Sequence, residues 1–159
     1  MNNLMQIIVF VLDDRRYALH LNAVQRILRI VDITPLPRAP DIVAGVINVH
    51  GLVVPVMKIR RRFGLPEREP RLTDHLIIAN SSTRAVGLEV DTVLGLLGIA
   101  ESEIVKAGQI VPATDYVEGV LKLPDGIVLI HDLDTFLSLE EEQTLEHAIQ
   151  GAEGRNLSL

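Results

Sequence analysis

The sequence contains no cysteine and no tryptophan among its 159 residues, and aromatic residues make up only 3% of it. The missing cysteines exclude disulfide bonds, thiolate nucleophiles and cysteine-based zinc sites. A core with so few aromatic side chains must be filled by valine, isoleucine and leucine, which favour β-strands. The rest of the composition is typical of a globular chain, with 48% hydrophobic and 23% charged residues.

Long apolar runs and an excess of positive charge are also missing. No uninterrupted apolar stretch reaches the roughly 18 residues of a membrane-spanning helix, and segment 1–6 lacks the basic region of a signal peptide. The formal net charge of −6 argues against wholesale binding of nucleic acid. We therefore expect a cytoplasmic protein without membrane insertion and without a nucleic-acid partner.

The chain carries an internal repeat. A pattern in its first half, Leu19, Leu21, Val24, Ile27, Asp41, Val43, Gly45 and Val46, returns in its second half as Leu88, Val90, Val93, Leu96, Asp115, Val117, Gly119 and Val120. Similarity at such a long period indicates two copies of one supersecondary unit. Two units cannot form a solenoid, but they can form two small barrels that face each other across a groove. We place the copies at about 6–66 and 72–138, within one domain that spans residues 1–159.

Many short apolar runs separated by turn signals predict a mainly β fold with antiparallel barrels. The expected strands are residues 7–12, 17–21, 24–31, 42–49, 52–56, 76–80, 85–90, 93–97, 119–123 and 127–130. The proline-rich segment 34–40 predicts an extended connector, since proline disrupts helices and central strands. Ser138 followed by Glu141 forms the pattern of a capping box, which predicts a C-terminal helix over about 139–150.

Residues that could support catalysis are present but are not arranged for it. The histidines are His20, His50, His75, His131 and His147, and none has the spacing of metal ligands. No serine sits in a nucleophile elbow, and no glycine-rich loop precedes a helix. We therefore expect no enzymatic activity, no metal and no cofactor.

Two other classes of protein deserve comparison. An apolar strand that ends in Asp13 and Asp14 is reminiscent of a phosphoacceptor receiver or phosphotransfer protein, but a receiver alternates strands with long helices, and this chain predicts none before residue 138. A basic cluster at Arg60–Arg62, Arg68 and Arg71 is either a solvated helix face or a surface for an acidic partner. It lacks interleaved aromatic residues, so a small nucleic-acid-binding barrel fits less well.

The segment Gly45–Val56, with its continuation to Gly64, resembles the CheW-like chemotaxis coupling (adaptor) protein family. That family carries the pattern G-V-I-N-L-R-G, followed by V-V-P-V-I-D-L and a short helix that ends in F-G. The similarity runs from about Gln6 to Ile149, and further matches are Tyr17–Leu19, Thr34–Pro37, Val86–Leu88, Tyr116–Gly119 and Ile127–Ile130.

The resemblance implies two five-stranded SH3-like barrel subdomains and an adaptor without catalysis. It implies binding to the regulatory domain of a CheA-like histidine kinase, and to the cytoplasmic tip of a chemoreceptor laid between the barrels, in two-component arrays at the inner membrane. Carried over to this chain, the protein-binding residues are Val24, Arg26, Ile27, His50, Gly51, Val86, Leu88 and Leu96.

Three positions depart from the family pattern, and all three change charge. Arg26 replaces a glutamate, His50 replaces an arginine, and Lys58 replaces an aspartate whose counterpart in the second copy is Asp132. One hypothesis is that the receptor site is more positive than usual and that the chain serves a divergent, non-standard chemosensory array. The alternative is that Arg26 is merely solvated and His50 is a neutral turn residue.

Overall fold

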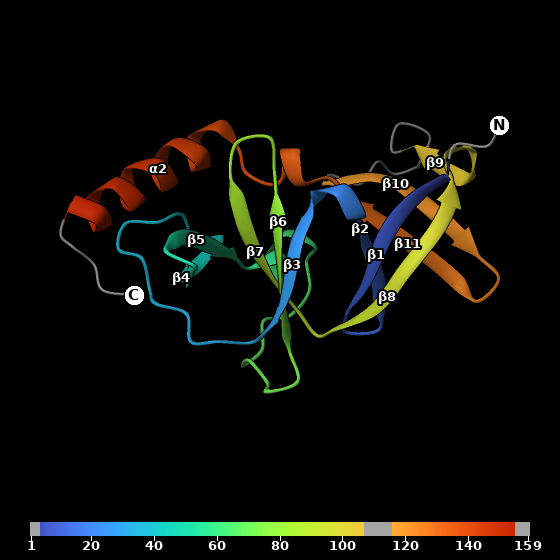
Figure 1. Ribbon diagram of the computed structural model, residues 1–159, viewed down its shortest axis with the longest axis horizontal. Helices are drawn as coiled ribbons and strands as arrows, with labels where there is room; N and C mark the ends of the chain where they lie inside the picture. Colours follow the sequence, from blue (N-terminus) through green and yellow to red (C-terminus); the bar gives the residue numbers. More distant parts are fainter. Residues whose placement is uncertain (1–3, 107–115, 155–159) are drawn as a thin grey trace.

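The computed structural model describes residues 4–106 and 116–154, whose strands form two mainly antiparallel sheets, each curved around its own core (Figure 1). The first copy of the repeat contributes β1 (Leu4–Leu12), β2 (Arg15–His20), β3 (Val24–Arg29), β4 (Val43–Val49), β5 (Leu52–Met57) and the short helix α1 (Ile59–Arg62). The second contributes β6 (His75–Asn80), β7 (Ala85–Val90), β8 (Thr92–Ala100), β9 (Ile104–Lys106), β10 (Val117–Leu123) and β11 (Gly126–His131), and the helix α2 (Leu139–Gly154) follows it. The mainly β prediction is confirmed, and Asp115 lies outside the described residues.

The two copies exchange strands. The first barrel has the order β8-β1-β2-β11-β10-β9, and the second barrel has the order β3-β6-β7-β5-β4. Each barrel thus combines the first two strands of one copy with the later strands of the other. The pairings are equivalent, because β1 pairs with β8 as β6 pairs with β3, and β2 runs parallel to β11 as β7 runs parallel to β5. The sequence boundaries of the copies therefore do not divide the molecule into two barrels in space.

The first barrel has six strands rather than the expected five, because β9 adds to its edge. In the second barrel the equivalent edge meets the proline-rich connector, where Thr34 forms a single bridge with Val46. Val46 corresponds in the repeat to Val120, which pairs with Val105 of β9. Prolines on either side of Leu36 have no N–H to donate, so the connector cannot extend this bridge into a strand. The connector was correctly predicted to be neither helix nor central strand, but it turns at Pro37 and Arg38 instead of running fully extended, and β9 was missed.

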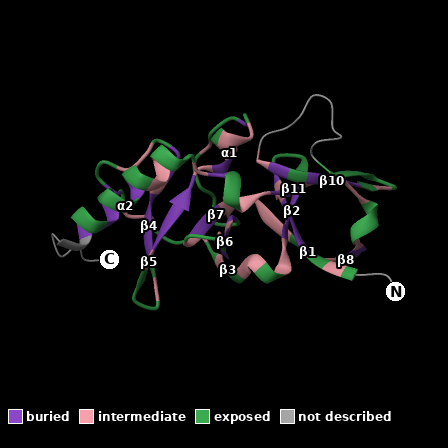
Figure 2. Ribbon diagram, turned by 90° about the horizontal axis from the view of Figure 1, so that it is seen from above, coloured by how far each residue is buried: buried purple, intermediate pink, exposed green. Residues whose placement is uncertain are grey.

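Three apolar cores stabilise the molecule. One fills each barrel, and a third and larger core lies between the barrels and under α2. Strands β1, β2 and β6 supply alternate residues to a barrel interior and to the central core, as Ile78 and Ile77 of β6 do. Burial of both faces explains why these strands read as continuous apolar runs rather than as alternating ones. Figure 2 shows the buried residues of both barrels and the buried face of α2.

Gly45 and Gly119 occupy equivalent bulges at the start of β4 and β10. In both strands the register shifts by one residue just before the glycine. A Cβ at Gly45 would lie 2.4 Å from the Thr34 carbonyl oxygen, and one at Gly119 would lie 2.5 Å from Ile104 Cγ2. The repeat of glycine thus follows from close backbone approach in both barrels.

Helix α2 begins at the predicted capping box. The Glu141 amide donates to Ser138 Oγ (3.1 Å), and the Ser138 amide donates to Glu141 Oε1 (2.9 Å). The helix runs to Gly154, four residues beyond the predicted end. Leu145 and Ile149 pack in the central core, as the periodicity predicts, but Leu139 is exposed because it lies in the first turn, before the helix reaches the barrel.

Candidate partner-binding surface and inter-barrel junction

Strand β3 forms a free edge of the second barrel and carries three of the predicted site residues. Val24 packs partly against the central core, Arg26 is exposed, and Ile27 is 39% exposed. Regular alternation would place Val24 and Arg26 on one face, but a bulge separates them: Val24 pairs with Ala79, and Arg26 pairs with the adjacent Ile78. The two side chains therefore point to opposite faces, because one inserted residue reverses the alternation.

Arg26 and His50 meet at the end of the second barrel, although 24 residues separate them in the sequence. Arg26 Nη1 lies 2.6 Å from His50 Nε2. Because a guanidinium can only donate, His50 Nε2 is the acceptor, and the ring is then the neutral tautomer with its proton on Nδ1. The turn that holds His50 is fixed locally: His50 has a φ of 52° and Gly51 a φ of 86°, and the Gly51 amide donates to Asn48 Oδ1 (2.7 Å).

Strand β8 is the equivalent edge of the first barrel and also exposes large apolar side chains. Leu94 and Leu96 are 58% and 53% exposed. Leu96 pairs with Ile8, which is on the same side of β1 as Phe10 of the central core, and Ile27 pairs with Ile77 of that core. Since directly paired residues share a face, Ile27 and Leu96 lie on the same sides of their sheets as Ile77 and Phe10 of the central core, but are exposed. Figures 1 and 2 agree that β3 and β8 lie on the same side of the molecule.

Two predicted site residues do not belong to this surface. Val86 and Leu88 of β7 are 4% and 0% exposed and pack in the central core. Both faces of β7 are covered, one by the central core and the other by the interior of the second barrel, so neither side chain is exposed to a partner. The match of Val86–Leu88 to the family pattern therefore reflects packing in the central core.

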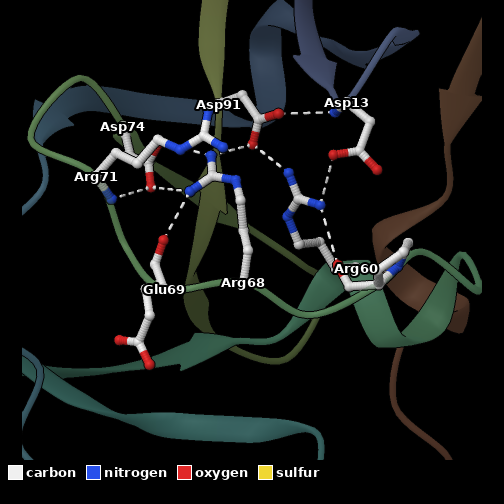
Figure 3. Close-up of polar contacts among 8 residues, drawn as sticks. Asp13, Arg60, Arg68, Glu69, Arg71, Asp74 and Asp91 are labelled. Carbon is white, nitrogen blue, oxygen red and sulfur yellow. Dashed lines mark hydrogen bonds and ion pairs between the residues drawn. The ribbon is translucent and has the colours of Figure 1, made fainter.

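A network of ion pairs ties the two barrels together beside this surface (Figure 3). Asp91 is at its centre, since Asp91 Oδ1 accepts from Arg60 Nη2 (2.6 Å) and from Arg68 Nη2 (2.6 Å). Asp91 Oδ2 accepts from the Asp13 amide (2.7 Å), and Arg60 Nη1 donates to Asp13 Oδ1 (2.8 Å). Burial alone would raise the pKa of Asp91, but the hydrogen bonds from Arg60, Asp13 and Arg68 hold it below its ordinary value.

Arg68 also pairs with Asp74, whose side chain is 1% exposed. The contact is bidentate, with Nη2 at 2.7 Å and Nη1 at 3.0 Å from the two carboxylate oxygens, and the Arg71 amide donates to Asp74 as well. The hydrogen bond with Asp74 raises the pKa of Arg68 despite burial. Burial opposes ionisation of Asp74, but these donors lower its pKa.

Three arginines of the basic cluster are therefore held by contacts within the chain, whereas Arg61 and Arg71 are exposed. Arg60 and Arg68 form ion pairs with acidic side chains of the chain itself. Arg62 pairs with Glu141, and its Cζ lies over the Tyr116 ring, 5.2 Å from the ring centroid. Sequence reasoning missed this network because Asp13 and Asp91 lie far from Arg60 in the sequence and are brought to it only by the fold. The signal that could have found it is the placement of Asp13, Asp74 and Asp91 at the ends of apolar strands.

A cavity of about 240 Å³ lies next to the network, with a floor that includes Met57 and Ile59. Lys58, one of the three departures from the family pattern, lines this cavity together with Glu89. Burial, and to a lesser degree the nearby charge of Asp74, raises the pKa of Glu89. Within the described ranges, neither Lys58 nor Glu89 has an ion-pair partner, so no ion pair there compensates the charge change at Lys58.

His131 is the one histidine in a core environment among the residues described. It is 2% exposed and lies between the rings of Phe63 and Phe136, each with a centroid 5.1 Å away. Neither ring nitrogen has a hydrogen-bond partner, and burial lowers its pKa to about 3. Asp132 accepts instead from the Asp134 amide, so His131 and Asp132 do not form a base with its orienting acid.

The described part of the chain offers no metal site, since no three histidine, aspartate or glutamate side chains there are grouped to hold an ion. None of the helices in the described ranges is long and apolar enough to cross a membrane. The surface offers apolar area on two edge strands, a paired arginine and histidine at one barrel end, and ion pairs at the junction between the barrels. Exposed apolar area of this kind is typical of a surface that contacts another protein.

Comparison with known proteins places the chain in a family. The model of the CheW-like domain matches residues 6–141. The chemotaxis protein CheW of Rhizobium meliloti (strain 1021) is 31% identical over 142 residues, which cover 87% of this chain and 90% of that protein. The chemotaxis protein CheW of Bacillus subtilis (strain 168) is 31% identical over 141 residues, with the same coverage of 87% and 90%. The crystal structure of the scaffolding protein TtCheW from Thermoanaerobacter tengcongensis superposes with a TM-score of 0.79 at 29% identity, covering 89% of this chain and 96% of that one. The chain therefore belongs to the CheW-like family.

Proposed function

We propose that this protein is a non-enzymatic adaptor that couples chemoreceptors to a CheA-like histidine kinase, and that it binds the receptor tip on the surface formed by β3 and β8. The observation that carries the proposal is the exposure of Ile27 and Leu96 at equivalent positions of two equivalent edge strands. Both strands lie on the same side of the molecule, so the two side chains can meet one partner. A helical hairpin can lay its apolar residues across such a surface.

The kinase binds elsewhere on this adaptor, through its regulatory domain. An exposed barrel end or edge strand is suited to that contact, and the hairpin turns at the barrel ends expose Leu52 and Ile127. Separate surfaces let one adaptor hold the receptor and the kinase at the same time. The complex forms in the cytoplasm, at receptor arrays on the inner membrane.

The fold argues against the two alternative functions. A receiver domain needs a parallel sheet with helices between its strands, whereas here the helices before residue 139 in the described ranges are single turns. A nucleic-acid-binding barrel needs free basic residues on an exposed face, and Arg60, Arg62 and Arg68 are paired with acids. The duplication of copies 6–66 and 72–138, in one domain over 1–159, remains our proposal for how the chain arose.

Binding measurements with Ile27→Glu and Leu96→Glu test the receptor surface. A charge in the apolar centre of an interface should cost about 2 kcal/mol or more. Affinity for the purified tip fragment of a receptor from the same cell, measured by calorimetry, should fall accordingly, while the kinase regulatory domain should bind as before. Leu72→Glu is the matched control, because Leu72 is 94% exposed in the linker before β6. Equal loss in all three variants, or no loss in any, would contradict the proposal.

A second experiment asks whether Arg26 and His50 select the partner. The double variant Arg26→Glu, His50→Arg restores the family pattern and reverses the direction of the pair that spans β3 and the β4–β5 turn. If charge sets partner choice, affinity for the protein's own receptor should fall and affinity for a receptor tip of a standard array should rise. Unchanged affinities would show that the substitutions are neutral.

A further inference from the structure

The chain crosses from the second barrel to the first through a single residue, Asp91. Strand β7 of the second barrel ends at Val90, and β8 of the first barrel begins at Thr92. The Asp91 amide donates to the Val11 carbonyl of β1 (3.0 Å), which anchors the crossing backbone to the first barrel. Any change in the angle between the barrels must therefore turn the backbone at this residue.

The Asp91 side chain binds groups from both sides of the junction. Arg60 of α1 and Arg68 of the linker lie on the side of the second barrel, and Asp13 lies in the β1–β2 turn of the first. Arg60 reaches Asp13 directly as well, so the three residues form a closed triangle across the junction. Their side chains are 12% exposed for Arg60, 19% for Asp91 and 42% for Asp13, so water screens the inner pair only weakly.

The other crossing has no such network. The counterpart of Asp91 in the repeat is Asn22, within the short 3-10 helix Leu21–Ala23 that joins β2 to β3. Asn22 is exposed, and its side chain makes no hydrogen bond to the described part of the chain. Asp91 thus contributes side-chain contacts across its crossing, whereas Asn22 contributes none among the described residues.

Each exposed edge strand begins directly after a crossing. Strand β8 starts one residue after Asp91 and carries Leu94 and Leu96, and β3 starts one residue after Ala23 and carries Ile27. A rotation about the junction therefore changes the spacing between the two halves of the exposed apolar surface. A partner that contacts both strands binds best at one spacing.

We infer that Asp91 is a positioning residue, which fixes the relative orientation of the barrels through Arg60 and Asp13 and thereby sets the affinity of the β3–β8 surface for a receptor tip. The first half of this inference, that Asp91 fixes the orientation of the barrels, depends on the junction alone. The second half, that this orientation sets the affinity for a receptor tip, rests on the proposed function.

Distance measurements between spin labels test the first half. The chain has no cysteine, so Leu52→Cys in the second barrel and Lys122→Cys in the first give two specific labels at exposed positions. In this background, Arg60→Met removes the cation that joins Asp13 to Asp91. Pulsed electron resonance should give one narrow distance distribution for the parent and a clearly broader or shifted one for the variant. An unchanged distribution would overturn the inference.

Affinity for the receptor tip fragment tests the second half in the same proteins. Arg60→Met should weaken binding about fivefold or more, which is a usual size for coupling between sites. Arg60→Lys, which keeps the charge but not the two-pronged contact, should recover part of both the narrow distribution and the affinity. Arg16→Met is the matched control: it removes the Arg16–Asp125 pair, which lies within the first barrel, and should change affinity by less than about twofold.

The outcomes separate the two claims. A broader distribution with unchanged affinity would show that barrel orientation does not set binding. Failure of the parent to bind any receptor tip from its own cell would contradict the proposed function, while the distance distributions would still decide the role of Asp91. If Arg60→Met does not fold, Asp13→Gly makes the same test, because it removes only the more exposed acceptor at a position whose φ of 55° suits glycine.

Discussion

At the scale of single residues, three glycines are required by the backbone, but for different reasons. Gly51 has a φ of 86°, and nothing lies within 4 Å of the place where a Cβ would be. The turn prediction for Gly51 is therefore confirmed for a conformational and not a packing reason. Gly45 and Gly119 are explained by close contacts instead, which the sequence alone does not distinguish from turns.

This distinction gives a first prediction. Gly51→Val should destabilise the protein by about 1–3 kcal/mol, since a β-branched residue is strained at positive φ. Gly98→Val is the control, because Gly98 is equally open but has no positive φ. Urea unfolding measures both. If the two variants lose the same stability, backbone strain at Gly51 is not the cause.

His131 supports a second prediction, on pH. Its folded pKa of about 3 is below the unfolded value of 6.5, so the unfolded chain binds the proton more readily between these values. The free energy of unfolding should therefore fall as the pH drops below about 6.5, by about 3 kcal/mol from this group between pH 7 and pH 4. Protonation of paired carboxylates such as Asp74 and Asp91 also lowers the free energy of unfolding in acid. The contribution of His131 must therefore be measured as a difference between the parent and a variant that lacks this histidine.

His131→Leu supplies that comparison, because it fills the space between Phe63 and Phe136 with an apolar side chain that does not titrate. The difference in unfolding free energy between parent and variant should grow in favour of the variant as the pH falls from 7 to 4. A difference that is constant with pH would show that His131 does not titrate on unfolding.

At the scale of secondary-structure elements, the sequence predicts those whose signals are local. Strand ends at turns, the proline-rich connector and the capping box of α2 all follow from residues within a few positions of one another. Strand β9 was missed because three residues, Ile104–Lys106, carry no periodicity. The bulge in β3 was missed because it depends on the partner strand β6, and it reverses the face on which Arg26 lies.

The capping box gives a third prediction. Ser138→Ala removes the hydroxyl that accepts from the Glu141 amide, which should cost about 1 kcal/mol. Amide hydrogen exchange in the first turns of α2 should speed up more than exchange in β6. Ser102→Ala is the control, since Ser102 is exposed and its side chain makes no hydrogen bond among the described residues. A cap that contributes nothing would leave exchange in α2 unchanged.

At the scale of the whole molecule, the sequence predicts two barrels but not which strands build each. Strand exchange is invisible in the repeat, because equivalent strands have the same pattern whichever barrel they join. The same limit applies to the candidate site. The family pattern marks Ile27 and Leu96, which are exposed, and it marks Val86 and Leu88 equally well, although these are buried. Only the fold separates a core strand from an edge strand.

Strand exchange has a consequence for folding, which is the last prediction. Neither copy alone can close a barrel: β1 and β2 need β8 and β11, and β6 and β7 need β3 and β5. Fragments 1–72 and 73–159 should therefore lack a cooperative unfolding transition when separate, because each would expose half of all three cores. The cut falls at Leu72, which is 94% exposed, so it breaks no core contact.

An equimolar mixture of the two fragments should regain the circular dichroism of the intact chain and bind its partners. The recovered complex should also dissociate on dilution, since the central core, the barrel pairings and the contact of Arg68 with Asp74 all join one fragment to the other. A fragment that unfolds cooperatively by itself would show that a single copy is an independent folding unit. It would then be the pairing within copies, and not the exchange between them, that stabilises each barrel.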